Sequence, residues 1–136
     1  MMKGATVGAF LLAGLIFFPL GITGEEILNQ VFLLVREREL VAFSAVQNTW
    51  VTLDLRSKEE VLDSRYDGHV AVAVTSRRVL GFSALTSRWA EERLMVGESV
   101  GSLEAEGNVG AVITNLRAFG FSASAGRWTV KRFELK

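Results

Sequence analysis

The chain has 136 residues, enough for one modest domain with a short appendage. Fifteen basic residues balance fifteen acidic ones, so the chain lacks the excess of Lys and Arg that a nucleic-acid surface needs. Cysteine is absent, which excludes disulfides and Cys-ligated zinc, and the single histidine, His69, excludes a histidine-rich metal site within one chain.

The N-terminal segment is apolar. Between Lys3 and Glu25 lie 21 residues without a charge, and a helix of about 20 such residues spans a bilayer. We expect residues 1–24 to form a transmembrane anchor that contacts lipid through residues 4–24. Because Lys3 is basic and Glu25 and Glu26 are acidic, the N-terminus should stay inside the cytoplasmic membrane and the rest should lie on the periplasmic or extracellular side.

A cleaved signal peptide is the alternative for the same segment. Pro19 and the glycines after it could precede a cleavage site, although no Ala-x-Ala pattern is present. The apolar run is also longer than the usual signal core of about 7–15 residues. The anchor is therefore the preferred interpretation.

Residues 25–136 contain an internal repeat. The stretches AFSAVQNTW (42–50), GFSALTSRW (81–89) and GFSASAGRW (120–128) follow one another at a spacing of 39 residues. The second and third repeats are identical at ten of 29 aligned positions, which indicates duplication. The predicted units are about 25–68, 69–107 and 108–136.

Each unit divides at its turns into four short predicted strands. The first (31–35, 70–74, 109–113) is a continuous apolar run, typical of a strand buried on both faces. The second carries Phe-Ser-Ala, the third starts at Trp and becomes charged, and the fourth (61–66, 100–105) is mixed. Asp67-Gly68 then turns the chain into the next unit. The last repeat ends before a fourth strand, and residues 25–29 resemble residues 59–63, so an N-terminal strand could supply it.

The order of second strand, turn and Trp in VLGFSALTSRWAEERL (79–94) resembles the blade signature of kelch and PQQ-type β-propellers. The resemblance implies an all-β domain of three tandem, four-stranded antiparallel blades. Propellers typically close with about 4–8 blades, so three blades need a further solution. Two chains could join as a homodimer in a six-bladed ring, a partner could complete an open arc, or the repeats could form a β-trefoil. The small, flat first strand (Val70 to Val74) favours blades.

The repeated aromatic residues are predicted to form the core between repeats; a ligand-stacking platform is the alternative. They are Phe43, Trp50, Phe82, Trp89, Phe121 and Trp128. Arginines repeated at the turns give a candidate interaction surface for carboxylates or phosphates, or are solvated or stacked on Trp. They are Arg78, Arg88, Arg117 and Arg127.

The remaining polar residues give no catalytic constellation. The repeated serines Ser44, Ser83 and Ser122 have no His or Lys at a fixed spacing that could activate them. His69 aligns with Asn108 and Gln30, and we interpret all three as turn residues. Glu59 and Glu98 match across repeats and are interpreted as solvated.

We therefore expect a protein that is not an enzyme and that has no cofactor or metal. The predicted function is an accessory or scaffold subunit of a larger membrane complex, of respiratory or photosynthetic type, whose β domain braces the outer face of other integral membrane subunits. The alternative is a secreted or periplasmic module that binds a glycan or an anionic ligand after signal cleavage. An enzyme would require a site built between chains.

Overall fold

The computed structural model describes residues 28–134, which form strands and turns. The expected transmembrane segment, the alternative signal peptide and most of the N-terminal strand expected at residues 25–29 lie outside the described residues. Within residues 28–134, no helix is long and apolar enough to span a bilayer.

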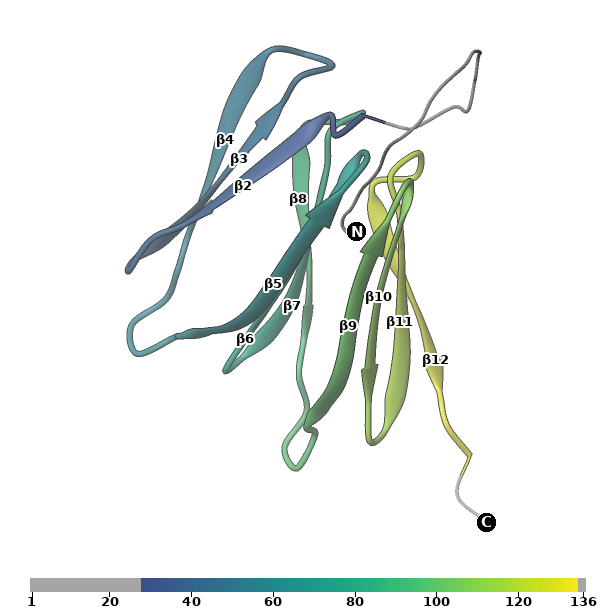
Figure 1. Cartoon of the computed structure of the whole chain (residues 1–136). Coiled ribbons are helices and arrows are strands. Elements are labelled where there is room, and N and C mark those ends of the chain that lie inside the picture. Colours follow the sequence, from purple (N-terminus) through teal and green to yellow (C-terminus); the bar gives the residue numbers. More distant parts are fainter. Residues whose placement is uncertain (1–27, 135–136) are drawn as a thin grey trace, which may run out of the picture.

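The described strands form three antiparallel sheets, placed side by side in Figure 1. The first sheet contains β2 (Val31–Val35), β3 (Glu39–Ser44) and β4 (Thr49–Asp54). The second contains β5 (Val61–Asp67), β6 (Val70–Thr75), β7 (Arg78–Ser83) and β8 (Arg88–Arg93). The third contains β9 (Val100–Glu106), β10 (Val109–Thr114), β11 (Arg117–Ser122) and β12 (Arg127–Arg132). The all-β class and the structural repeat are thus confirmed.

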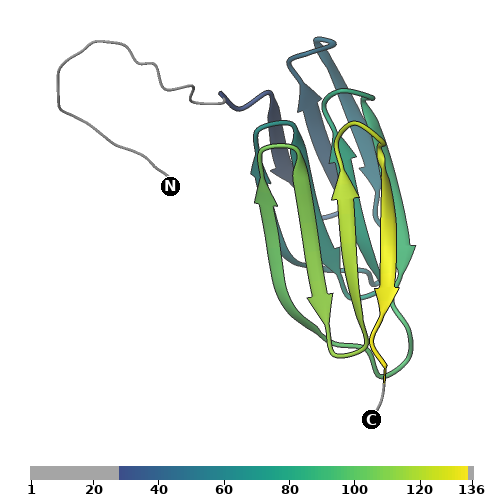
Figure 2. The same cartoon turned by 90° about the vertical axis from the view of Figure 1, so that its right-hand side faces the viewer.

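The sheets stack face to face with their strands in similar directions (Figure 2). The second sheet lies in the middle, so every residue of β6 and β7 is buried. The end sheets bury only one face, and β2 and β10 alternate between buried and more exposed positions. The apolar run at 31–35 and 109–113 is therefore buried on one face only, because the stack ends there.

Apolar side chains fill the two layers between the sheets. The first layer contains Val31, Leu33, Leu40, Ala42, Ala71, Ala73, Leu80, Phe82 and Ala84. The second contains Val70, Val72, Val74, Val79, Leu103, Val112, Phe119, Phe121, Ala123 and Trp128. Alternate residues of β6 and β7 enter opposite layers, as the period of two in a strand requires.

The predicted fourth strand of each unit is the first strand of the next sheet. Residues 61–67 (β5) pair with β6 and residues 100–106 (β9) pair with β10. The two-residue turns Gly68-His69 and Gly107-Asn108, one residue later than predicted, make these strands antiparallel neighbours. Longer linkers separate β4 from β5 and β8 from β9. A β-trefoil needs a barrel wall shared by the repeats, but the described strands form separate sheets.

Neighbouring sheets approach closely at the turns before β6 and β10. Gly68 and Gly107 have φ angles of 55° and 61°, and a Cβ on Gly68 would lie 2.4 Å from the Gly107 carbonyl oxygen. The His69 amide donates to that same oxygen at 2.8 Å. Glycine is required at position 68 both for its backbone conformation and for the contact between sheets.

Candidate interaction surfaces

The repeated Trp residues differ in burial along the stack. Trp128 is 7% exposed, Trp89 is half-buried and Trp50 is 56% exposed. The Trp89 and Trp128 indoles donate to the preceding sheet, to Val51 O at 3.1 Å and to Ala90 O at 3.2 Å. Trp50 has no sheet before it among residues 28–134, so the same repeat position is part of the core twice and lies at the surface once.

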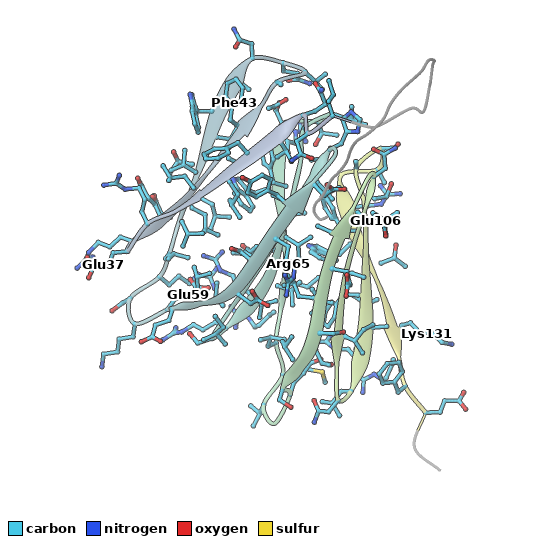
Figure 3. The ribbon with its side chains drawn as sticks, viewed as in Figure 1. Glu37, Phe43, Glu59, Arg65, Glu106 and Lys131 are labelled. Carbon is cyan, nitrogen blue, oxygen red and sulfur yellow. The ribbon has the colours of Figure 1, made fainter. Side chains whose placement is uncertain are left out.

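The outer side of the first sheet is an apolar surface, which we call the N-terminal face. It consists of Phe32, Leu34, Val41, Phe43 and Trp50. Phe32 and Trp50 meet edge to face with ring centroids 6.5 Å apart, and Phe43 lies 4.9 Å from Trp50. Figure 3 shows Phe43 on the first sheet. Phe32, Leu34 and Trp50 are each more than a third exposed, and adjoining apolar side chains of this kind mark interaction sites.

The outer side of the third sheet is a second apolar surface, the C-terminal face. It consists of Val109, Ala111, Ile113, Ala118 and Gly120. Val109 is 58% exposed and Ile113 is 39% exposed. The side chains of this face are smaller than those of the N-terminal face, and none is aromatic.

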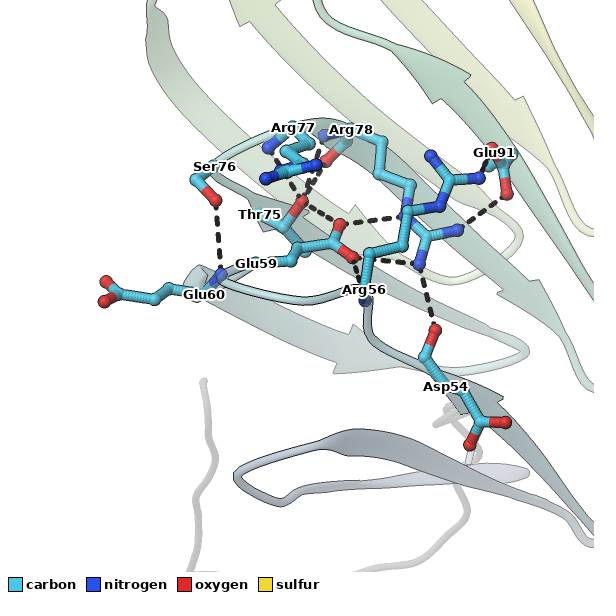
Figure 4. Close-up of polar contacts among 9 residues, drawn as sticks. All are labelled: Asp54, Arg56, Glu59, Glu60, Thr75, Ser76, Arg77, Arg78 and Glu91. Atoms are coloured by element: carbon cyan, nitrogen blue, oxygen red, sulfur yellow. Dashed lines mark hydrogen bonds and ion pairs between the residues drawn. The ribbon is translucent and has the colours of Figure 1, made fainter.

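Arg78 lies in the interior, although the sequence suggested a surface role. The residue is 4% exposed, and its guanidinium donates two hydrogen bonds to Glu59, from Nε to Oε2 at 2.8 Å and from Nη2 to Oε1 at 3.0 Å (Figure 4). Its Nη1 donates to Glu91 Oε1 at 2.7 Å, and its Nη2 also donates to Asp54 O at 3.0 Å. Four of the five N–H donors of Arg78 are therefore used within the fold, and its side chain is too buried to form an interaction surface.

Glu59 is also buried, so its interpretation as a solvated residue was wrong. Its carboxylate accepts from Thr75 Oγ1 at 2.5 Å and from the Arg56 amide at 2.8 Å, besides Arg78. Figure 3 shows Glu59 on the linker between the first and second sheets. This Glu59 cluster (Glu59, Thr75 and Arg78) ties that linker to the β6–β7 turn and fixes how the two sheets meet.

The same arrangement recurs 39 residues later as the Glu98 cluster (Glu98, Thr114 and Arg117). Arg117 donates to Glu98 from Nε at 3.0 Å and Nη2 at 2.6 Å, and Thr114 Oγ1 donates at 2.6 Å. The Arg117 guanidinium also stacks 4.7 Å above the Phe119 ring. Arg88 and Arg127, the other two predicted surface arginines, are exposed.

Both clusters shift the pKa values of their members. Burial alone would raise the pKa of Glu59, but hydrogen bonds from Arg78, the Arg56 amide and Thr75 outweigh it and lower that pKa to about 2. For Glu98, the hydrogen bond from Arg117 is the main cause, and it lowers the pKa to about 2 against the effect of burial. The hydrogen bond to Glu59 raises the pKa of Arg78. Both ion pairs are therefore fully charged at neutral pH.

Sequence reasoning missed these clusters, although the repeat carried a signal for them. The second and third sheets share the Thr and the Arg, each with a Glu 16 residues before the Thr. The first sheet has Arg36 and Glu39 at the positions of Thr75 and Arg78. The Thr and the Arg are thus replaced together in the first sheet, as expected of side chains that bind one another. In the first sheet, Arg36 and Glu39 form an exposed ion pair at 3.5 Å.

The repeated serines and His69 have packing roles. Ser44 and Ser83 are buried and donate to Ala84 O and Ala123 O of the next sheet, both at 2.6 Å. His69 Nδ1 lies 2.7 Å from Asn108 Oδ1 of the next sheet. These hydrogen bonds of Ser44, Ser83 and His69 connect adjacent sheets.

A groove of about 490 Å³ runs between β5 and β9, and Leu62, Asp63, Leu94 and Val100 are among its lining residues. In residues 28–134, no group of three or more His, Asp or Glu side chains could hold a metal ion. The two end faces, described above, are the larger apolar surfaces and are the candidates for function that we consider further.

Comparisons of the chain with protein-family models, with curated protein sequences and with solved structures found no match.

Proposed function

We propose that this protein is a non-enzymatic, membrane-anchored accessory or scaffold subunit of a larger membrane protein complex. The β domain braces the outer side of that complex, and the three sheets act as blades of an open, propeller-type arc. The N-terminal face carries this proposal, because it exposes Phe32, Leu34 and Trp50 together. Covering large apolar side chains with a partner removes their surface from water, which contributes favourable binding free energy.

Two sequence features support the membrane part of the proposal. The uncharged run between Lys3 and Glu25 is long enough for one membrane helix. The charge-balanced repeat domain is of a kind that presents extended binding surfaces. A complex of respiratory or photosynthetic type would accommodate such a subunit, with the β domain on the periplasmic or extracellular side.

The experiment is to solubilise membranes mildly, isolate the full chain and identify the proteins that copurify. We expect integral membrane subunits to copurify with the wild type and with Val96→Glu, a control at a fully exposed site in the β8–β9 linker. Trp50→Glu should lose them, because a charge on the N-terminal face opposes burial. Migration of the wild type alone, or copurification unchanged by Trp50→Glu, would refute the proposal.

A second candidate is a secreted or periplasmic module that binds glycans. It is favoured by the exposed aromatic cluster in which Tyr66 packs against Phe32 with ring centroids 5.6 Å apart, next to Trp50. A mature chain that begins near Glu25, together with glycan binding that Trp50→Ala abolishes, would establish this candidate over the membrane subunit.

A further inference from the structure

We infer that the two end faces bind each other, so that a second copy of this chain docks head to tail and two chains close a ring of six sheets. This inference keeps the scaffold role of the proposed function but closes its open arc: the second copy covers the N-terminal face, and the other membrane subunits contact the remaining surfaces of the ring. It follows from the internal repeat. Surfaces equivalent to the N-terminal face and the C-terminal face already pack against each other within one chain, once between the first and second sheets and once between the second and third.

The N-terminal face is equivalent to a buried surface of the second sheet. Residues 39 positions after its members are Ala71, Ala73, Leu80, Phe82 and Trp89, which pack against the first sheet. A further 39 residues along, Gly110, Val112, Phe119, Phe121 and Trp128 pack against the second sheet. Each repeat thus places this set of residues against the sheet before it, and only the first repeat lacks such a partner in the described chain.

The C-terminal face is equivalent to the opposite surface of the second sheet, which packs against the sheet that follows it. Residues 39 positions before its members are Val70, Val72, Val74, Val79 and Gly81, which pack against the third sheet. At Gly81 the fit is close, because an added Cβ would lie 2.8 Å from the Phe121 ring and 2.9 Å from Trp128. Gly120 is the equivalent residue on the C-terminal face, and it leaves room there for Phe43 and Trp50 of another copy.

Hydrogen-bonding groups at the two ends also match. Trp50 Nε1 and Ser122 Oγ–H have no acceptor among residues 28–134, although their equivalents within the chain all donate across a junction. At the same repeat spacing, their acceptors in a docked copy are Thr129 O and Ala45 O. The Asn108 amide, equivalent to the His69 amide, would likewise meet Asn29 O. Three donors would therefore find acceptors at each new junction.

The Glu59 and Glu98 clusters have no counterpart in the first sheet, and this difference fits the assembly. Each covalent linker between sheets is held by a Glu–Arg–Thr cluster, as Glu59 and Glu98 show. The first sheet has Arg36 and Glu39 in place of the Thr and the Arg, and no linker needs to be held where one chain meets another. A head-to-tail contact generates either a ring or a fibre, and six sheets fall within the range of about 4–8 at which such rings close.

The test is the mass of the full chain in detergent, measured by light scattering as the protein is diluted. We expect two chains for the wild type and for Val96→Glu. Trp50→Glu on the N-terminal face and Ile113→Glu on the C-terminal face should each give single chains, with the dissociation constant raised at least about tenfold. An equimolar mixture of Trp50→Glu and Ile113→Glu should recover a pair of chains, because one intact junction can form between them, and this recovery also shows that both variants fold.

Several results would overturn the inference. A monomeric wild type would do so, as expected if residues 1–27 of the same chain cover the N-terminal face. Dissociation by Trp50→Glu alone would indicate a symmetric contact between two N-terminal faces, and a mass that grows without limit would indicate a fibre. A monomer that still copurifies with other subunits would refute the ring and leave the proposed function standing. A dimer that copurifies with no other subunit would support the ring and refute the proposed function.

Cross-linking gives a second, positional readout, because the chain has no cysteine. Chains with Gln30→Cys, mixed with chains with Asn108→Cys, should form a disulfide between chains on oxidation. The variant with both His69→Cys and Asn108→Cys is the control within one chain, since those side chains lie 2.7 Å apart. Cross-linking of the control without cross-linking of the mixture would contradict the docking geometry.

Discussion

The three repeated Trp residues allow a comparison in which the side chain is constant and only its burial changes. Replacing Trp128 with Ala removes a side chain that is 7% exposed and that packs against Phe121 and Gly81. Such a truncation of the core costs about 3–5 kcal/mol. It also leaves Ala90 O without its hydrogen bond from the indole, which adds about 1 kcal/mol.

Trp50→Ala removes the same side chain from a site that is 56% exposed. Less than half of the surface of Trp50 is therefore buried in the folded chain, and only this part contributes to stability. Scaling by burial gives a cost of about 1–2 kcal/mol, with no cavity term because the site is open to solvent. The free energies of unfolding of the two variants should therefore differ by at least about 2 kcal/mol, with Trp89→Ala between them.

The assay is urea unfolding followed by far-UV circular dichroism, since fluorescence would change with the number of Trp residues. All variants carry Ile113→Glu, so that self-association does not add to the stability of the chain. Equal losses for Trp50→Ala and Trp128→Ala would refute the stacking order of the sheets, because that order alone makes the two sites different.

Three further predictions concern the clusters and turns. Glu59→Gln should lower the free energy of unfolding, measured by urea titration, by about 2–3 kcal/mol, because Arg78 loses its buried counter-charge. Adding Arg78→Met should restore part of this loss. A double variant that is less stable than Glu59→Gln would contradict the prediction. Because the folded pKa values of Glu59 and Glu98 lie near 2, below their ordinary value of 4.5, their stabilisation is complete above pH 4.5 and is lost as the pH falls towards 2. With allowance for solvent screening this amounts to about 1–2 kcal/mol for each carboxylate, and acid titrations of the Glu→Gln variants should be flatter than those of the wild type. Gly68→Ala should lower the melting temperature far more than Gly97→Ala: both residues have positive φ, but a Cβ on Gly97 would meet nothing within 4 Å. Equal losses would argue against the close approach of the sheets at Gly68.

The strands could be predicted from the sequence almost to the residue, because the apolar runs, the Phe-Ser-Ala stretches and the glycine turns are local signals. Residues 31–35 match β2, and the predicted strand at 61–66 differs from β5 by one residue. The sheet to which β5 belongs was predicted wrongly, because unit boundaries were drawn at the turn before position 69. The tight turn at Gly68 would have corrected this, because a turn of two residues pairs β5 with β6.

The candidate surfaces were harder to predict, because burial in a stack depends on whether a neighbouring sheet exists. Trp50, Trp89 and Trp128 have the same local sequence signal and different environments. Similarly, Arg78 and Glu59 look like surface residues in isolation, and only the fold brings a linker and a turn 19 residues apart into one ion pair. Charged residues at turns are usually solvated, so composition gave no warning.

The central claim is that a partner covers the N-terminal face, and hydroxyl-radical footprinting of the full chain in native membranes tests it most directly. Oxidation of Phe32 and Trp50 should fall severalfold in membranes relative to the purified, diluted chain, while oxidation of fully exposed Val96 stays the same. Equal oxidation of Phe32 and Trp50 in both preparations would show that the face is open in the membrane, and it would contradict the account.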